Sequence, residues 1–150
     1  MLILNRSMAL RSKHYAKELM TIHPRTLHPD DLVMDNIKIF EEHKINHVPV
    51  VNQDGIIEGL LARRDFESYA NITKIIQANT SDPVCVRDVM STSIFIYSSN
   101  IQIVDAAQAM VDNDIHAILI ADEKKHLLGI VTSTDLLRHM ADRDRYSRFT

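Results

Sequence analysis

Two stretches of the chain repeat one pattern of residues. Residues 16–70 align with residues 86–140 without a gap, at an offset of 70. Identical residues recur at Met20/Met90, Asp35/Asp105, Ile45/Ile115, Gly59/Gly129 and Asp65/Asp135. Between these positions apolar residues replace apolar ones, as at Val48/Ile118 and Leu60/Ile130. A repeat of supersecondary size whose apolar faces survive duplication predicts two units that bury those faces against each other.

Composition narrows the class of protein. A chain of 150 residues suits one domain, and 45% hydrophobic with 25% charged residues is the balance of a soluble globular protein. No apolar run approaches the roughly 20 residues that cross a bilayer, and the single Cys85 cannot form an internal disulfide. We therefore expect a cytoplasmic protein. A net charge of −3 gives no general attraction to nucleic acid or membrane, so local groups must hold any anionic ligand.

The periodicity changes in the same order within each copy. Apolar residues spaced at i, i+4 and i+7 predict a helix after a short strand, and compact apolar runs predict buried strands. Turn residues then lead into a hairpin partner and a second helix. In the first copy these are a strand at 24–28, a helix through Val33, Ile37 and Phe40, strands at 47–51 and 56–61, and a helix from Arg64. In the second copy they are a strand at 94–98, a helix through Ile103, Ala107 and Met110, strands at 117–121 and 127–131, and a helix from Thr134.

Each hairpin ends in a related heptad that resembles the motif of the CBS domain. The second copy has the full pattern, Gly129-Ile130-Val131-Thr132-Ser133-Thr134-Asp135, whereas the first reads Gly59-Leu60-Leu61-Ala62-Arg63-Arg64-Asp65 and lacks the threonine. The apolar-Pro-Val strand at 48–51 adds to the resemblance, which covers residues 16–140 and is that of a tandem pair, or Bateman module.

The resemblance implies an α/β (α+β) fold of two pseudo-symmetric β-α-β-β-α repeats packed sheet to sheet. We assign the first repeat to residues 16–79 and the second to residues 80–141. Residues 1–15 are expected to form an arm or helix, and residues 142–150 a flexible C-terminal tail. That end of the chain alternates arginine with aspartate, which favours a solvated terminus over contact with RNA.

The heptad has chemistry of its own. Glycine at its first position allows close backbone packing or a bulge. An aspartate at a helix start presents two acceptor oxygens, which suit the paired hydroxyls of a ribose. Thr132 and Thr134 add hydroxyls, and the free amides of a helix N-terminus favour phosphate. Asp65 and Asp135 also fit as plain helix caps worth about 1 kcal/mol each. The repeated heptad and the family resemblance favour a nucleotide role for Asp135, whereas both interpretations stay open for Asp65.

In the family, a pocket joins the aspartate heptad of one repeat to the loop before the first helix and the second strand of the other repeat. On this sequence, the first pocket would comprise Thr132, Thr134, Asp135, Asp30, Asp31, Ile45, Asn46 and His47. The second pocket would comprise Arg63, Arg64, Asp65, Asn100, Ile101, Ile115 and His116. The two differ, because acidic side chains in the first could repel a polyphosphate, whereas the second offers cations to it. We expect an adenine nucleotide in at least one pocket, with Ile45 or Ile115 against the base.

Catalytic and metal-binding signatures do not occur in the sequence. Neither Cys85 nor any serine lies in a GxSxG context, and three glycines are too few for a phosphate-binding loop. Eight histidines invite a metal site, but no CxxC pair or HExxH helix is present. His23 and His28 are expected to be solvated loop residues. The sequence therefore predicts neither an enzyme nor a metal site, and no required cofactor.

Three functions fit the sequence. The first is an adenine-nucleotide sensor for AMP, ADP or ATP that forms a homodimer and passes its state to an unidentified effector protein. The second is a dimerisation or interaction module with degenerate pockets. The third keeps the fold but binds another adenosyl ligand, such as S-adenosylmethionine. Neither nucleic acid nor membrane is an expected partner.

Overall fold

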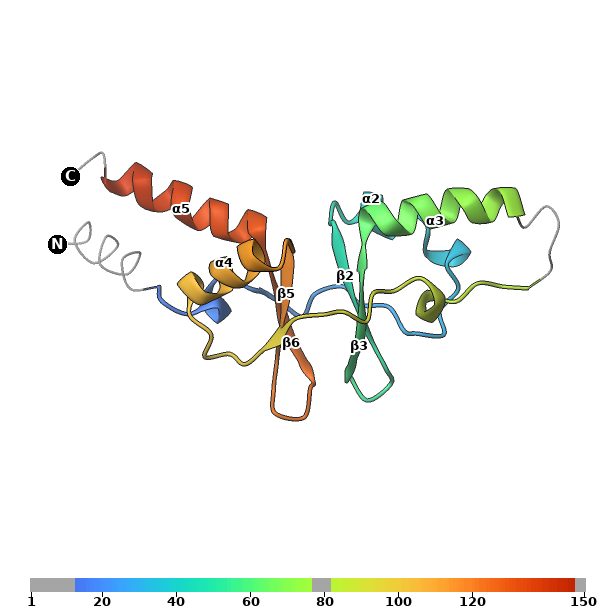
Figure 1. The fold of residues 1–150 in the computed structure, drawn as a ribbon, viewed down its shortest axis with the longest axis horizontal. Helices are drawn as coiled ribbons and strands as arrows, with labels where there is room; N and C mark the ends of the chain where they lie inside the picture. The colour runs from blue at the N-terminus through green and yellow to red at the C-terminus, as the bar shows by residue number, and fades with distance from the viewer. Residues whose placement is uncertain (1–12, 77–81, 148–150) are drawn as a thin grey trace. The chain divides into compact units, whose positions relative to one another are not determined.

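The computed structural model describes residues 13–76 and 82–147, which form two compact units (Figure 1). Within these ranges, unit 1 comprises residues 13–22, 95–122 and 128–147, and unit 2 comprises residues 23–76, 82–94 and 123–127. The first residues of each repeat therefore belong to the unit built mainly from the other repeat.

Unit 1 has a four-stranded sheet in the order β1-β6-β5-β4. Its strands are β1 (Thr21–Ile22), β4 (Ile96–Tyr97), β5 (Ala117–Ala121) and β6 (Leu127–Thr132). Thr21 of the first repeat pairs antiparallel with Ile130, and Ile96 pairs parallel with Leu119. Helices α4 (Ile103–Asp112) and α5 (Ser133–Ser147) pack against each other, and a 3₁₀ helix spans Ala16–Glu18.

Unit 2 has the same arrangement of elements, but the strands at the edges of its sheet are shorter. Strands β2 (His47–Val51) and β3 (Ile57–Ala62) form its hairpin, and α3 (Arg63–Ile76) follows directly. Single bridges extend the sheet, with Leu27 parallel to Val50 and Ser91 antiparallel to Leu60. Short helices are the 3₁₀ turns Met34–Asn36 and Val86–Asp88 and the α-helix α2 (Ile39–Glu42). The predicted α/β class and order of elements are confirmed, but the strand predicted at 24–28 is reduced to one bridge.

The first helix of the first repeat is interrupted at Asn36, where an unbroken helix was predicted. The side-chain Nδ2 of Asn36 donates to the carbonyl of Leu32 over 2.9 Å, and its backbone N–H turns to Val33 instead, over 3.2 Å. At the equivalent position of α4, the buried Ala106 donates its N–H to Gln102 in a regular helical bond of 2.9 Å. Asparagine competes for backbone acceptors in this way, so the segment becomes a 3₁₀ turn followed by a short α2.

Each unit has one apolar core. In unit 2, Phe40 and Phe66 meet with their ring centroids 5.3 Å apart and their planes tilted by 55°. The equivalent positions of unit 1 are Met110 and Leu136, which pack with the buried β-branched residues of β5 and β6. Burying each phenylalanine stabilises the fold by roughly 1.5–3 kcal/mol. The apolar stripes read from the sequence therefore do face the cores.

The turns that end the two equivalent helices share a left-handed backbone conformation. Lys44 ends α2 with φ 51°, and Asp114 ends α4 with φ 50°. In the first repeat the N–H of the following residue, Ile45, donates to the carbonyl of Phe40 over 3.1 Å. In the second repeat the N–H of Ile115 donates to the carbonyl of Met110 over 3.0 Å. Helices usually place glycine at this left-handed position. Both copies thus form a glycine-type cap without a glycine.

The C-terminal helix is longer than predicted. Helix α5 extends to Ser147, so residues 142–147 have a helical backbone in the range assigned to a flexible tail. Most of the predicted arm at 1–15, and residues 148–150, lie outside the described residues. None of the helices that the structure describes is long and apolar enough to span a membrane.

Candidate functional site

Glycine opens each heptad because a neighbouring segment approaches it closely. A Cβ added at Gly59 would lie 2.5 Å from the Sδ of Met90, and one added at Gly129 would lie 2.6 Å from the Sδ of Met20. Real Cβ atoms do not tolerate such contacts. The close packing predicted for these glycines is present, and in each unit the neighbour comes from the start of the other repeat.

Asp135 caps the N-terminus of α5. Its Oδ2 accepts the backbone N–H of Thr132 over 2.8 Å and the hydroxyl of Thr132 over 3.0 Å. Among the described residues, its Oδ1 has only a long contact of 3.4 Å with the guanidinium of Arg138. The side chain is 14% exposed. A carboxylate oxygen accepts more than one hydrogen bond, so the cap uses one oxygen and leaves the other able to accept hydroxyl groups.

The first heptad is arranged differently. Ala62 has no hydroxyl, and within residues 13–76 and 82–147 the exposed carboxylate of Asp65 has no hydrogen-bond donor. The Nε of Arg63 donates to Glu67 over 2.8 Å in an exposed pair, whereas Arg64 is exposed. The sequence predicted both arginines as phosphate ligands, but Arg63 already has a carboxylate partner.

Each heptad is bound to the start of the strand in its own repeat. The N–H of Arg63 donates to the carbonyl of Asn46 over 2.8 Å, and that of Ser133 to the carbonyl of His116 over 2.9 Å. Because the chain crosses between units, the residues of each predicted pocket are divided between unit 1 and unit 2. Their combination into two pockets therefore stays a prediction.

The remaining predicted residues differ in burial. Ile45 packs against the core of unit 2, and Ile101 and Ile115 pack against the core of unit 1. His47 is partly buried on β2. The exposed members are Asn46, Asn100, His116 and Thr134.

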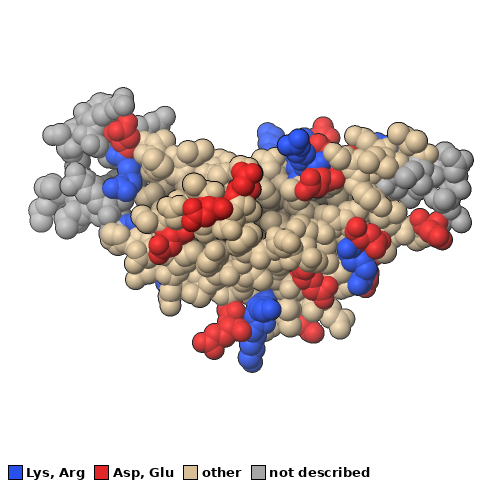
Figure 2. Space-filling view, in the orientation of Figure 1, with Lys and Arg blue, Asp and Glu red and all other residues tan. Residues whose placement is uncertain are grey.

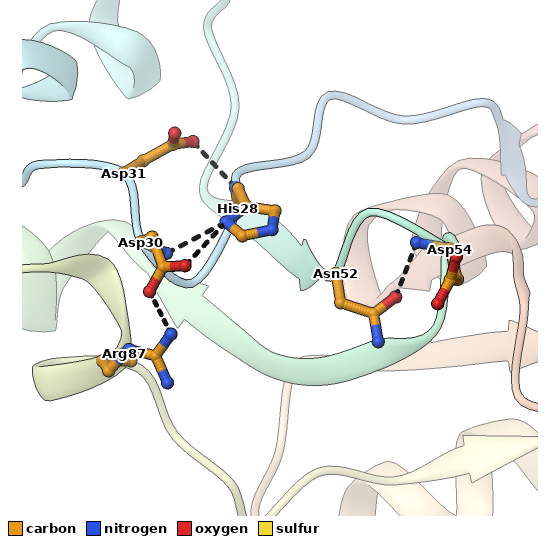
Figure 3. A network of polar contacts seen from close by, with 6 residues as sticks. All are labelled: His28, Asp30, Asp31, Asn52, Asp54 and Arg87. Carbon is orange, nitrogen blue, oxygen red and sulfur yellow. Dashed lines mark hydrogen bonds and ion pairs between the residues drawn. The ribbon is translucent and has the colours of Figure 1, made fainter.

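Both carboxylates of the acidic loop before the first helix have partners within unit 2 (Figure 3). The guanidinium of Arg87 pairs with the carboxylate of Asp30 and holds its pKa below the usual range. His28 accepts the N–H of Asp30 at Nδ1 over 3.1 Å, and its own N–H donates to Asp31 over 2.7 Å. The expected repulsion of phosphate is therefore reduced, since one carboxylate is paired with a cation and the other caps a backbone N–H.

Sequence reasoning missed Arg87. Its equivalent in the first repeat is Lys17, so both copies have a cation at this position, directly before Glu18 or Asp88. Those acidic residues cap the two 3₁₀ helices, with Asp88 accepting the N–H of Cys85 and Glu18 that of Tyr15, each over 3.0 Å. The repeated basic-acidic pair was the available signal.

A cavity of about 510 Å³ in unit 2 was also missed. It lies between the extended residues 25–27 and the interrupted helix. Its lining is Arg25, Thr26, Leu27, Met34, Asp35, Asn36, Ile37, Lys38, Ile39, Glu42 and His43. The first repeat has Asn36 where the second repeat has Ala106. This difference is the sequence signal for the interrupted helix that forms one wall of the cavity.

Charges on the visible face are scattered rather than gathered by sign, with uncharged surface between them (Figure 2). In the part of the chain that the structure describes, no three His, Cys, Asp or Glu side chains come together as ligands for a metal ion.

Comparison with known proteins identifies the repeat. The model of the CBS domain family matches residues 16–70 and again residues 86–142. Inosine-5'-monophosphate dehydrogenase of Methanocaldococcus jannaschii is 28% identical over 127 residues, which cover 82% of this chain. The same residues are 24% of that enzyme, so the chain spans about a quarter of its length.

Two solved structures share the fold. CBSX2 in complex with AMP superposes with a TM-score of 0.75 at 20% identity, covering 88% of this chain and 99% of that one. The CBS domain pair of protein MJ0100, in complex with 5'-methylthioadenosine and S-adenosyl-L-methionine, gives a TM-score of 0.74 at 22% identity. That superposition covers 86% of this chain and 97% of the other.

Proposed function

Because the chain belongs to the CBS domain family and has two copies of the domain in tandem, we propose that it is a cytoplasmic regulatory module that binds an adenosine-containing ligand. The ligands of the two similar structures, AMP in one and 5'-methylthioadenosine with S-adenosylmethionine in the other, have the adenosyl group in common. An adenosyl group offers a flat base and a pair of ribose hydroxyls, whatever its 5' substituent.

The carboxylate of Asp135 is the observation that best supports this function. In the described part of the chain its Oδ1 has only the long contact with Arg138, so it can accept a ribose hydroxyl while Oδ2 keeps its hydrogen bonds to Thr132. A hydrogen bond to a charged group contributes about 1.5–3 kcal/mol. The ligand would replace the Arg138 contact, which is exposed and weak.

Asp65 is the weaker ribose candidate. Without a threonine at position 62, the first heptad has no hydroxyl to fix the carboxylate, and ordering it on binding costs side-chain entropy. Arg64 and His116 remain proposed phosphate partners in the pocket centred on Asp65. The two pockets predicted from the sequence thus stay proposals, with the adenosyl group assigned first to the one that contains Asp135.

Calorimetric titration of the full chain with AMP, ADP, ATP and S-adenosylmethionine tests the function. We expect Asp135→Asn to weaken binding at least tenfold. Asp65→Asn is the matched control and leaves the same site unchanged. Thr132→Val separates the cap from the ligand, because it loses one cap bond but keeps the carboxylate. If none of the four ligands binds at millimolar concentration, the proposed ligand class is wrong and the interaction-module alternative takes its place.

The homodimer predicted from the sequence also has a candidate surface. Val104 and Val111 on α4 and Leu137 and Met140 on α5 are between 64% and 75% exposed, and the two helices pack side by side. Large exposed apolar patches mark interaction sites. The first repeat has Glu41 and Glu67 in place of Val111 and Leu137, so we propose that two copies meet through unit 1.

Light scattering after gel filtration tests this assembly. Val111→Glu with Leu137→Glu places the charges of the first repeat on the second and should give a monomer. The exposed Ile72→Glu on α3 is a control for added charge elsewhere and should leave the dimer intact. A wild-type monomer at high concentration would contradict the proposal. The effector protein that reads the bound state stays part of the proposed function.

A further inference from the structure

The cavity beside α2 has the size of a small-molecule site. Its volume of about 510 Å³ lies within the roughly 300–1,000 Å³ typical of such sites. One wall is the extended segment 25–27, and the other is formed by the 3₁₀ turn Met34–Asn36 and by α2. All of these elements belong to unit 2, so the cavity is described within one compact unit.

Charged side chains of both signs line this cavity without partners. In the described part of the chain, Arg25, Lys38, Asp35 and Glu42 make neither a hydrogen bond nor an ion pair through their side chains. Two cations and two anions leave the lining neutral. All four side chains are exposed, so a ligand must compete with water for them. A ligand with a single charge would meet two like charges, whereas a ligand with both charges can pair with both kinds of group.

The cations are specific to the first repeat. Arg25 and Lys38 correspond to Phe95 and Gln108 in the second repeat, whereas the acidic Asp35 and Glu42 correspond to Asp105 and Asp112. Duplication therefore kept the carboxylates in both copies, and only the first copy has basic groups to face a ligand anion.

Apolar groups complete the lining. Met34, Ile37 and Ile39 are partly buried and line the same cavity. They can shelter a hydrocarbon side chain, which gains roughly 25 cal/mol for each Å² of apolar surface removed from water. A small molecule with an ammonium group, a carboxylate and a short apolar part matches all three kinds of lining.

We propose that this cavity binds a free α-amino acid as its zwitterion. Arg25 and Lys38 bind the carboxylate, since the guanidinium fork matches carboxylate geometry. Asp35 and Glu42 accept the ammonium, and the apolar residues contact the side chain. A nucleotide suits this lining less well, because it brings several negative charges and no cation to pair with Asp35 and Glu42. The site is separate from the residues proposed to hold the adenosyl group.

Nuclear magnetic resonance titration of the ¹⁵N-labelled full chain tests the proposal. The probes are L-leucine, L-methionine and L-serine, with leucinamide and N-acetyl-L-leucine as analogues that lack one of the two charges. Saturable shifts are expected for the amides of residues 34–43 with a zwitterion at low millimolar concentration. Either analogue should bind at least tenfold more weakly.

Matched variants locate the site. Arg25→Gln and Asp35→Asn should each weaken amino-acid binding at least tenfold. Asp105→Asn, at the equivalent position on α4, should leave it unchanged. AMP affinity measured on Arg25→Gln should equal that of the wild type, so that loss of one site is told apart from loss of the other. The proposal fails if no amino acid gives saturable shifts at tens of millimolar, if the single-charge analogues bind as well, or if Arg25→Gln has no effect.

Discussion

Gly129 of the second repeat packs against Met20 of the first, so closely that a Cβ on the glycine would stand 2.6 Å from the methionine sulfur. The carbonyl oxygen of Thr21 would be 2.8 Å from the same Cβ. The backbone of β6 and the segment that leads into β1 thus exclude any side chain here. Gly59 and Met90 repeat the relationship in the other unit.

Replacing Gly129 with alanine should lower the free energy of unfolding by about 1–3 kcal/mol, the cost of overpacking a well-filled site. Urea denaturation measures it. Met20→Ala in the Gly129→Ala background should recover part of the loss, because the thioether is removed while the Thr21 carbonyl remains. The same recovery from Met90→Ala, whose contact is with Gly59, would contradict the assignment.

Replacing Asn36 with alanine should restore a regular helix in the first repeat. The Leu32 carbonyl then becomes free to accept the backbone N–H of residue 36, and helix propensity favours alanine over asparagine by up to about 0.7 kcal/mol. Far-ultraviolet circular dichroism should show a gain in helix. The reciprocal change, Ala106→Asn in α4, places an amide at a fully buried position and should reduce stability. Equal effects of the two changes would contradict this explanation of the broken helix.

Glycine at positions 44 and 114 should stabilise the protein. Lys44 and Asp114 both have a left-handed backbone, which costs a non-glycine residue about 1 kcal/mol. Thermal unfolding of Lys44→Gly and of Asp114→Gly should each show an increase in the free energy of unfolding of up to that size. Gly55, with φ 79°, provides the opposite test, since Gly55→Ala should destabilise the hairpin turn.

The stability of unit 1 should depend on pH through His139. This side chain is 7% exposed on α5, and burial lowers its pKa, with Arg143 and Lys13 acting in the same direction and Asp142 and Glu18 opposing them. The folded state then binds a proton less readily than the unfolded state. Its stabilising contribution is present above the unfolded pKa of about 6.5 and is lost as the pH falls through the lower folded value, by up to about 1.4 kcal/mol per pH unit.

Denaturation of His139→Leu between pH 5 and pH 7 checks this dependence. We expect the variant to lose less stability than the wild type as the pH falls through that range. His43→Leu, at an exposed position at the end of α2, is the control for replacing an exposed histidine with leucine. An unchanged slope in His139→Leu would contradict the assignment.

The repeated pattern predicted most of the fold for physical reasons. Strands β2 and β5 follow the apolar runs that begin at His47 and Ala117, because a continuous apolar run fits a strand buried on both faces. The two glycines were predicted to allow close packing, and they do. Asn36 broke the expected helix because one side-chain amide competed with one backbone bond, an effect that the spacing of apolar residues does not report.

The candidate site was less predictable. Asp135 lies at a helix start as predicted, and its part in a ligand site stays a prediction. That one oxygen caps the helix while the other has only a long contact follows from distances to Thr132 and Arg138, which the sequence does not give. The pairing of Arg87 with Asp30 spans 57 residues of sequence, and no local pattern predicts such a contact. The two-residue strand β1 is exposed at both positions, so it lacks the alternation that marks a strand in sequence.

The crossing of the chain between units has a consequence for how the protein folds. Thr21 finds its strand partner only at Ile130, so the sheet of unit 1 cannot be completed during synthesis until most of the chain has been translated. Contacts between residues so distant in sequence slow folding, because a long loop must close first. A chain cut back to either copy alone would leave β3 or β6 without its neighbouring segment, with an unpaired edge open to other molecules. After duplication, each copy supplies the edge segment that completes the sheet built mainly from the other copy.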